Sequence, residues 1–520
     1  MKIFLSLFLG LSLSCHSSQQ ITSEPAQDPA VPISATHYAE IIKEENLKEQ
    51  LYTYASDEFE GRETGKSGQK KAVEYLKSQY IKLGIPAAKG GQNYFQQVPL
   101  EVGQIPKGEM RLNGEQYALG DDFLTFESIN ASFGQIVYLG YGIEDPLYSD
   151  YEGLDVEGKL VLVKLGEPFT NNGQYVISGN KEKSVWSNMS ESLEKRINIA
   201  AEKGAAGLIH YDPMNYSRFK SRFDWLDEND NGRMQLKTPG DSQFFNVYVD
   251  TPLANAIYPE IDSSADPKTI DFKIEMAIES QNREINSENV VAVIKGAELP
   301  NEYVVISSHL DHIGITPTGQ INNGADDNGS GTVALLEIAK AFKAAEAEGH
   351  GPKRSVVFLH FTGEEKGLLG SQYYTDVDPI FPLEQTVANL NIDMIGRIDP
   401  KRKGGRNYVY LIGSDKLSSE LHRLSEEVND KYAQLELDYA YNDINDPNRF
   451  YYRSDHYNFA KNNVPIIFYF NGTHDDYHRP GDTPDKINYD LLQKRTRLIF
   501  HTAWEIANRR DRVSVDRATK

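Results

Sequence analysis

The sequence has one cysteine, Cys15, among 520 residues. A disulfide needs two cysteines, so no bridge within the chain can stabilise it, and its stability must come mainly from a buried core. Basic residues are also scarce, because 54 Lys and Arg stand against 76 Asp and Glu, a net charge of −22. This excess repels phosphates, so we expect no nucleic-acid partner and no attraction to an anionic membrane surface.

Long hydrophobic runs are absent as well. The most apolar stretch, MKIFLSLFLGLSLSC (1–15), is shorter than the roughly 20 residues of a membrane-spanning helix, and it fits a signal peptide. Cys15 follows its apolar core and resembles the lipidated cysteine of bacterial lipoproteins. We therefore expect an exported protein, in the periplasm or on the outer membrane of a bacterium, that touches the membrane only through a lipid on Cys15. An ordinary secretory signal with an incidental cysteine is the alternative.

Several catalytic motifs are missing. The chain contains no HExxH, which excludes a zincin helix, and no GxSxG, which leaves a serine nucleophile without support. It has no GxxxxGK[ST] phosphate loop, and its cysteine lies in the leader rather than at a candidate nucleophile position.

Composition divides the chain into segments. Residues 16–36 are rich in Ser, Gln and Pro and fit a linker. The stretch SGQKKAVEYLKSQYIKLG (67–84) places apolar residues at helical spacing, begins at a serine and ends at a glycine, which predicts a helix. Between 120 and 258 the composition changes, and we interpret 171–190 and 215–245 as loops of an inserted domain.

The second half alternates strands with helices. Four runs are apolar, β-branched and aromatic, while TVALLEIAKAFKAA (332–345) places its apolar residues on one helical face. The four runs are EYVVISS (302–308), SVVFLHF (355–361), VANLNID (387–393) and VPIIFYF (464–470). This pattern predicts an α/β fold with a mostly parallel sheet sandwiched by helices. In such sheets, functional groups gather beyond the carboxyl ends of the strands.

Acidic residues and histidines stand at those ends. The four runs lead into HLDH, TGEEKG, the terminal aspartate of NID, and THDDYH, while GADDNGSG lies between the first two. Any one of these fits a solvated loop charge, but their joint arrival at matching strand ends indicates a metal site. A carboxylate-rich set drawn from distant segments suits two metals that share a bridging carboxylate and promote hydrolysis.

The ordered series HLDH, GADDNGSG, TGEEKGLLGS, NIDMIGR and DYHRPGDT resembles the di-zinc aminopeptidases of metallopeptidase family twenty-eight. That group also holds glutamate carboxypeptidases, glutaminyl cyclases and the non-catalytic transferrin receptors. The resemblance runs from about 288 to 505, and EFEGRETGKSGQKKAVEYL resembles the N-terminal part of the family. It implies a phosphorylase/hydrolase-like zinc peptidase fold, two Zn²⁺ ions and peptide substrates.

The resemblance also assigns roles to single residues. One zinc would be held by His309 and Asp393, the other by Glu365 and His478, with Asp327 bridging both. Glu364 would be the general base that deprotonates a metal-bridging hydroxide or its parent water, and Asp311 would orient His309. Tyr477 would stabilise the oxyanion. Neighbouring side chains of an extended segment point in different directions, which agrees with separate roles for the adjacent Glu364 and Glu365.

The segment between the peptidase parts resembles a protease-associated domain, whose signs here are GYG, DVEGK and KGAAG. We therefore expect a zinc peptidase domain of residues 37–119 and 259–510, with a β-rich insert of residues 120–258 that limits access to the site. An independent decorative insertion is the alternative.

The expected function is aminopeptidase, with a carboxypeptidase or dipeptidase of the glutamate carboxypeptidase type as the alternative. Glutaminyl cyclase and a non-catalytic receptor are remote alternatives, because the full set of ligands and the base are present. Only 42 residues follow His478, too few for the helical dimerisation domain of the glutamate carboxypeptidase branch, so we expect a monomer or weak dimer. Arg453, in YYRSDHYNF, is a candidate substrate-binding residue. We expect four other histidines not to be ligands: His312, His360, His456 and His474.

Overall fold

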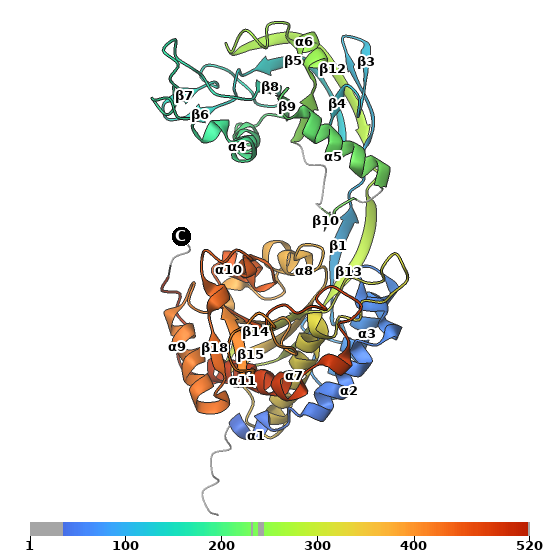
Figure 1. Ribbon diagram of the computed structural model, residues 1–520, viewed down its shortest axis with the longest axis vertical. Helices are drawn as coiled ribbons and strands as arrows, with labels where there is room; N and C mark the ends of the chain where they lie inside the picture. The colour runs from blue at the N-terminus through green and yellow to red at the C-terminus, as the bar shows by residue number, and fades with distance from the viewer. Residues whose placement is uncertain (1–34, 230–231, 238–243, 518–520) are drawn as a thin grey trace, which may run out of the picture.

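The computed structural model describes residues 35–229, 232–237 and 244–517, which form two lobes joined by a narrow neck (Figure 1). The expected signal peptide, 1–15, with Cys15 lies outside the described residues, as does the linker 16–36 apart from its last two residues. Each lobe contains a sheet of its own, and strands β1 and β13 run through the neck. None of the helices in the described ranges has the length and hydropathy needed to cross a bilayer.

The first sheet has nine strands. Its centre is parallel, since β14 pairs in parallel with both β15 and β16, and β16 pairs in parallel with β19. The pairs β1–β13, β13–β15 and β17–β19 are antiparallel. The strand order is β10 (Met234–Leu236), β1 (Phe95–Val102), β13 (Arg283–Ile294), β15 (Arg354–Phe361), β14 (Leu299–His309), β16 (Thr386–Ile392), β19 (Ile466–Phe470), β17 (Tyr408–Ile412) and β18 (Glu436–Asp438). The expected α/β fold is confirmed, with its parallel strands in the middle.

The first sheet lies between two helical layers. Every residue of β15 is buried, because successive side chains point into opposite layers and both layers are apolar. In β14, Val304 and Ile306 pack into one core, and Val305 packs into the other. The larger core includes α1 (Ala35–Ala39), α2 (Glu44–Tyr54), α3 (Ser67–Leu83), α7 (Gly331–Ala347), α9 (Ser419–Val428) and α11 (Tyr489–Asn508). The smaller core includes α10 (His456–Lys461).

Helix α3 forms where the sequence predicts it. It begins at Ser67 and ends at Leu83, and Gly84 follows in the left-handed conformation with φ of 69°. Glycine adopts this conformation without steric cost, so it ends the helix cleanly. Ala72, Leu76 and Tyr80 lie on the buried face.

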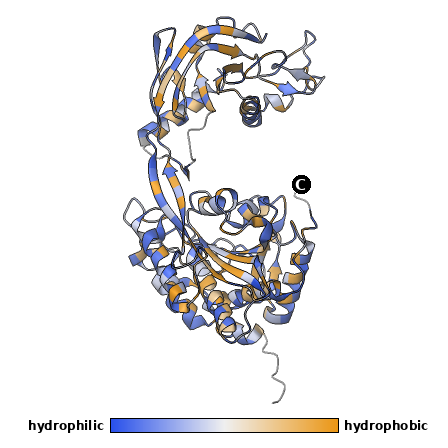
Figure 2. Ribbon diagram, turned by 180° about the vertical axis from the view of Figure 1, so that it is seen from behind, coloured by the Kyte–Doolittle hydropathy of each residue, from blue (hydrophilic) through white to orange (hydrophobic). Residues whose placement is uncertain are grey.

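The second sheet has eight strands and forms the core of the second lobe. Its long strand β12 alternates exposed and buried positions toward its end, as a sheet with one solvated face does. In Figure 2 the strands of this lobe show alternating bands of polar and apolar residues, whereas the central strands of the first sheet are mostly apolar. The order is β3 (Glu115–Ala118), β2 (Lys107–Leu112), β12 (Lys268–Glu279), β5 (Ile129–Tyr138), β8 (Leu160–Lys164), β9 (Gly207–Tyr211), β11 (Phe245–Val249) and β4 (Phe123–Leu124).

The second sheet extends beyond the expected insert of residues 120–258 on both sides. Strands β2 and β3 precede this range and β12 follows it, and β2 pairs with both β3 and β12. The chain therefore leaves the first sheet after β1, touches its edge once at β10 and returns to it at β13. The small hairpin of β6 (Glu144–Asp145) and β7 (Tyr148–Ser149) also belongs to this lobe.

The interpretation of residues 215–245 as loop was wrong, because α5 spans Tyr216–Asn229. The polar composition of the segment hid a short apolar pattern. Phe219 stacks near Tyr248 and Phe223 is buried, and this four-residue spacing places both rings on one helical face. The other helices of the lobe are α4 (Met189–Glu202) and α6 (Thr251–Ile257).

The topology turns one edge of the first sheet toward the second lobe. Strand β13 enters the first sheet from the neck, and β15 runs antiparallel to it. The parallel strands β14 and β16 follow the direction of β15, so their carboxyl ends point back toward the neck. The short helix α8 (Leu369–Gln372), which comes after β15, lies on the side of the first lobe that faces the second (Figure 1).

Candidate metal centre

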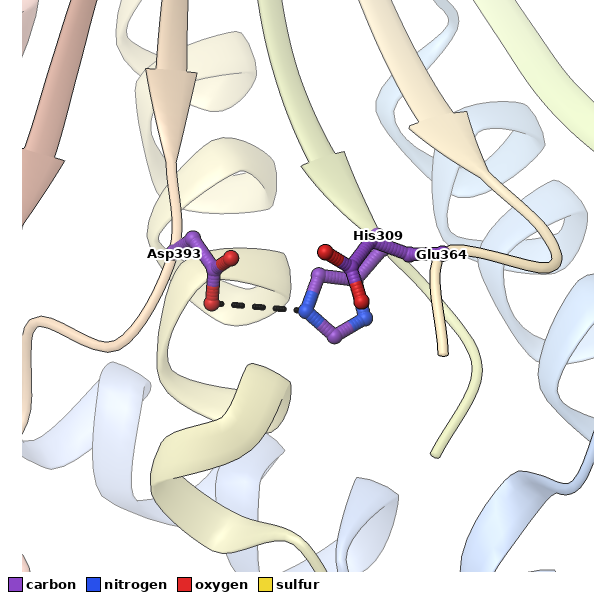
Figure 3. A group of neighbouring side chains, drawn as sticks. All are labelled: His309, Glu364 and Asp393. Atoms are coloured by element: carbon purple, nitrogen blue, oxygen red, sulfur yellow. Dashed lines mark hydrogen bonds and ion pairs between the residues drawn. The ribbon is translucent and has the colours of Figure 1, made fainter. Parts of the chain in front are cut away.

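Three side chains from neighbouring strand ends meet beyond the first sheet (Figure 3). His309 is the last residue of β14, Asp393 directly follows β16, and Glu364 lies in the loop after β15. One donor atom from each lies within 4.8 Å of the others. The His309 Nε2 atom is 3.3 Å from Asp393 Oδ1, the contact drawn as a dashed line in Figure 3. Parallel strands that end at one edge therefore bring together residues that lie far apart in sequence.

Asp327 links this group to a second one. It lies in the buried turn Ala325–Ser330 that leads into α7. Its Oδ1 atom is 3.3 Å from His309 Nε2, and its Oδ2 atom is 3.1 Å from His478 Nε2. One carboxylate thus presents one oxygen to each of two imidazoles. A carboxylate that bridges two cations needs this arrangement.

Glu365 completes the second group. Its Oε2 atom is 3.1 Å from His478 Nε2, and its Oε1 atom is 2.8 Å from His312 Nδ1. His312 was not expected to be a ligand, and the structure places its ring in the cluster, with Nδ1 also 3.8 Å from Asp327 Oδ2. His312, Asp327 and Glu365 each offer a donor atom within 4.8 Å of the others. The sequence signal that could have indicated a place for His312 in the cluster is its position three residues after His309, in HLDH.

The electrostatics of the cluster favour a bound cation. Burial raises the pKa of the Glu364 carboxyl well above its usual range, and nearby carboxylates add to the effect. Burial also acts to raise the pKa of Asp327, but hydrogen bonds from His309 and His478 hold it well below its usual range. Burial acts to lower the pKa of His478, but hydrogen bonds to Asp327 and Glu365 and their charges raise it to about 10. Protons on the imidazoles thus neutralise the acids here, a task that a divalent cation performs equally well.

The donor set fits zinc. Zinc takes imidazole nitrogen and carboxylate oxygen in sites with few ligands, and both donor types converge in each group. All five expected ligands lie together in the structure: His309, Asp327, Glu365, Asp393 and His478.

Asp311 supports the site in two ways. The His309 Nδ1 atom is 3.1 Å from the main-chain oxygen of Asp311 and 3.8 Å from its nearer carboxylate oxygen. The ring is thus held by the main chain of Asp311 more closely than by its side chain. The carboxylate accepts hydrogen bonds from Thr64 Oγ1, at 2.7 Å, and from the main-chain N–H of Glu364, at 3.2 Å. It therefore fixes the loop that carries the expected base.

Further residues that position the site were not singled out from the sequence. The buried Arg62 donates to the carbonyl oxygens of Leu310, at 3.2 Å, and Gly324, at 2.8 Å, and so ties together the segments that carry His309 and Asp327. Asp482 accepts from the main-chain N–H of Asp327 at 3.1 Å. These contacts join segments that are distant in sequence, so no local sequence pattern predicts them.

The wall beside the cluster contains the two other candidates. Tyr477 and Arg453 line a small cavity of about 30 Å³ together with three carboxylates of the cluster, and the Arg453 guanidinium lies 3.5 Å from the Tyr477 hydroxyl oxygen. Burial raises the pKa of Tyr477 well above its usual range, so its hydroxyl stays protonated. Ser454, next to Arg453, donates to Asp393 Oδ2 at 2.7 Å. The apolar part of the wall consists of Met394, Phe450, Phe468 and Phe470, and Thr473 and His478 complete the lining.

Three other histidines lie outside the cluster. His360 is buried between the hydroxyls of Tyr80 and Ser308. His456 contacts the main-chain oxygen of Tyr451 and stacks on Phe468. His474 lies 3.2 Å from Asp326, the acid beside Asp327. Their partners are ones that buried structural histidines commonly have.

A carboxylate–imidazole cluster at the carboxyl ends of parallel strands is an arrangement that metal-dependent hydrolases use. In agreement with this, residues 289–503 match the model of Peptidase family M28. That range includes every residue of the cluster.

Individual relatives show the same similarity. The chain is 29% identical over 242 residues to leucine aminopeptidase 2 of Arthroderma otae, a match that covers 42% of this chain and 45% of the relative. It is 34% identical over 106 residues to a probable glutamate carboxypeptidase of Arabidopsis thaliana, covering 20% and 14%. The chain thus spans less than half the length of these curated relatives. An aminopeptidase from Aneurinibacillus sp. strain AM-1 aligns over 93% of this chain and 98% of its own, with 18% identity and a TM-score of 0.45.

Proposed function

We propose that this protein is a zinc-dependent exopeptidase that releases N-terminal residues from peptides. The observation that carries the proposal is the small cavity in which cluster carboxylates meet an aromatic wall. Glu364, the carboxylate of this cavity that would hold no zinc ion, offers negative charge to a free α-ammonium group, while Phe450 and its neighbours accept an apolar side chain. A cavity this small accommodates a chain end more readily than the middle of a peptide.

In this proposal, His309 and Asp393 would hold one Zn²⁺ ion, Glu365 and His478 would hold a second, and Asp327 would be shared by both. When bound, the zinc ions supply the Lewis acidity that activates water and polarises the scissile carbonyl. The match of residues 289–503 to Peptidase family M28 and the two oxygens that Asp327 presents to two imidazoles support this assignment.

The Glu364 carboxylate acts as the general base. It takes a proton from the attacking water and delivers it to the nitrogen of the leaving amine, so its own protonation state is restored after each turnover. Burial and the neighbouring carboxylates raise its pKa, whereas a bound dication would lower it. The main-chain hydrogen bond from Glu364 N–H to Asp311 holds the loop in place during this transfer.

Tyr477 stabilises the developing oxyanion. Its protonated hydroxyl is a hydrogen-bond donor, and Arg453 approaches its oxygen from the other side. The guanidinium therefore leaves the hydroxyl proton free to point toward substrate. One such donor contributes about 3–4 kcal/mol to transition-state stabilisation in comparable hydrolases.

Export and lipidation of Cys15, and the identity of the second lobe as a protease-associated domain, belong to the same proposal. A lipid anchor predicts that labelled fatty acid is incorporated in cells and that Cys15→Ala abolishes the label. Access control by the second lobe agrees with the direction of β14 and β16, whose carboxyl ends carry the cluster and point toward the neck.

The test is an assay of the zinc-loaded protein on Leu-, Lys- and Glu-arylamides and on N-acetylated peptides. We expect cleavage of the Leu-arylamide, loss of activity with a chelator and recovery with zinc. Cleavage of N-acetylated peptides alone would overturn the aminopeptidase proposal in favour of the carboxypeptidase alternative.

A further inference from the structure

Strand β10 brings part of the second lobe to the edge of the first sheet. It follows α5 in the chain and pairs antiparallel with β1, with Leu236 opposite Leu100. Just before it, Gly232 lies so close to Gly103 that a Cβ atom would stand 1.3 Å from the Gly103 carbonyl oxygen. The main-chain oxygen of Arg233 accepts a hydrogen bond from Gly103 N–H at 3.1 Å. The backbone at Arg233 is therefore fixed to the neck.

The side chain of Arg233 reaches the loop of the expected base. Its Nη2 atom lies 3.6 Å from the position that a Cβ on Gly367 would occupy. Gly367 closes the turn that starts at Glu364, because its N–H donates to the Glu364 carbonyl oxygen at 2.9 Å. The guanidinium thus lies beside the turn that carries Glu364 and Glu365.

This guanidinium is exposed and makes no hydrogen bond or ion pair with the residues that the structure describes. Its neighbours differ in this respect. Lys366, in the same turn, pairs with Glu63 at 3.0 Å, and Lys237, at the end of β10, pairs with Glu284. The backbone of Arg233 is therefore fixed to the neck, and the hydrogen-bond donors of its guanidinium are available to a ligand.

A groove of about 490 Å³ continues from Arg233 along the neck. Lys107 and Arg222 also line it, and Asp227 is its one acidic residue. The groove is thus basic, whereas the cavity at the cluster is lined by three carboxylates. A short peptide whose N-terminal residue lies at the cluster can therefore direct its C-terminal carboxylate toward a basic groove.

We propose that Arg233 is a specificity-determining residue that binds the C-terminal carboxylate of short peptides while their N-terminal residue lies at the cluster. The proposal rests on the aminopeptidase function proposed above and adds a preference for di- and tripeptides with a free carboxylate. The segment between α5 and β10 supplies this residue, whereas the loops after β14, β15 and β16 supply the reacting groups.

The test compares each peptide with its own amide. The zinc-loaded full-length protein is assayed on Leu-Gly and Leu-Gly-Gly, on their C-terminal amides, and on Leu-p-nitroanilide. We expect kcat/KM to be about tenfold higher for the free acid than for the amide at one or both lengths, the effect of one charge-assisted hydrogen bond. In Arg233→Gln this ratio falls to about one, mainly because KM for the acid rises.

Lys237→Gln is the matched control. It removes a cation that lies four residues after Arg233, at the other end of β10, and that is already paired with Glu284. We expect it to keep the wild-type ratio. A ratio of about one in the wild type, or an unchanged ratio in Arg233→Gln, would overturn the role of Arg233 while the aminopeptidase function stands. If the wild type cleaves none of these substrates, the proposed function itself is refuted.

Discussion

Buried acids differ between the two lobes. In the second lobe, the Glu167 carboxylate is buried and accepts hydrogen bonds from Ser184 N–H, from Ser184 Oγ and from Ser187 Oγ. In the first lobe, the half-buried Glu364 carboxylate receives no hydrogen bond from the described residues and lies near His309 and Asp393. A carboxylate that is partly shielded from water and has no protein donor is free to meet a cation, water or substrate. The comparison distinguishes an acid kept for structure from one kept for chemistry.

The two sheets explain where such acids gather. The parallel strands β14, β15 and β16 end at one edge and send their following loops to a common place. The second sheet also contains parallel pairs, β5–β8 and β8–β9. Among the described residues, however, the two groups that could hold a metal ion both lie in the first lobe. Parallel pairing therefore offers a place for a site, and the loop sequences decide whether it is used.

Substitution of the two contrasted acids gives the largest expected effect. Glu364→Gln should lower kcat by about 10²- to 10⁴-fold, the usual contribution of a general base, and leave the zinc content unchanged. Glu167→Gln should leave kcat and zinc content unchanged and lower the free energy of unfolding by about 1–3 kcal/mol, because its amide cannot accept all three hydrogen bonds. Arylamide kinetics, metal analysis and denaturant unfolding measure the three quantities.

Two results would contradict this contrast. Zinc loss in Glu364→Gln would make Glu364 a ligand in place of, or in addition to, a base. Full activity in the same variant would remove it from the reaction altogether.

The cores of the two lobes can be separated by matched leucines. Leu162 in β8 and Leu359 in β15 are both fully buried, and each belongs to the core of its own lobe. Truncation to alanine should cost about 2–5 kcal/mol in either case. We expect Leu162→Ala to lower the unfolding transition of the second lobe alone, with kcat on a Leu-arylamide kept, and Leu359→Ala to lower that of the first. Calorimetry showing one transition that shifts equally in both variants would mean that the lobes unfold as a unit.

Local patterns carried much of the sequence-based prediction. Buried strands such as β15 are read from a continuous apolar run, and α3 from its spacing, its serine start and its glycine end. Helix α5 was missed because Tyr216, Phe219, Phe223 and Leu226, which stand at helical spacing, are separated mainly by polar residues. The prediction for the Asp311 side chain was also incomplete, because its carboxylate accepts hydrogen bonds from Thr64 and from the main chain of Glu364. Such contacts depend on packing between distant segments, which one sequence does not reveal.

Buried histidines provide a test by pH. Burial lowers the pKa of His210, in the second lobe, to about 4. Between pH 6.5 and 4 the unfolded chain binds a proton on His210 that the folded lobe does not bind. The contribution of neutral His210 to the free energy of unfolding is therefore complete above pH 6.5 and is lost as the pH falls toward 4. His210→Gln should flatten the fall in second-lobe stability between pH 7 and 4 by up to about 3 kcal/mol. Urea unfolding at several pH values measures this.

The matched control for pH lies in the first lobe. Burial lowers the pKa of His360 to about 3, so His360→Gln should flatten the acid sensitivity of the first lobe and leave that of the second unchanged. An unchanged pH profile in His210→Gln would show that other groups govern the acid sensitivity of the second lobe.

His312 gives the smallest expected effect and the sharpest distinction within the cluster. Its Nδ1 atom lies at Glu365 Oε1, whereas His478 lies at Oε2, so the two imidazoles occupy different oxygens of one carboxylate. We therefore expect His478 to be a ligand and His312 to orient Glu365. His312→Ala should weaken the affinity for one zinc by about 10- to 100-fold, as loss of an orienting partner does, and leave two zinc ions bound at saturating metal.

His312→Asn separates orientation from ligation. The asparagine side chain can still donate one N–H to Glu365 Oε1, so it should restore most of the affinity if His312 only orients that carboxylate. If His312 were itself a ligand, the asparagine variant would lose one zinc at saturation, as His478→Ala should. Zinc titration by calorimetry on the four proteins decides between the two roles, because affinity and stoichiometry change independently in these variants.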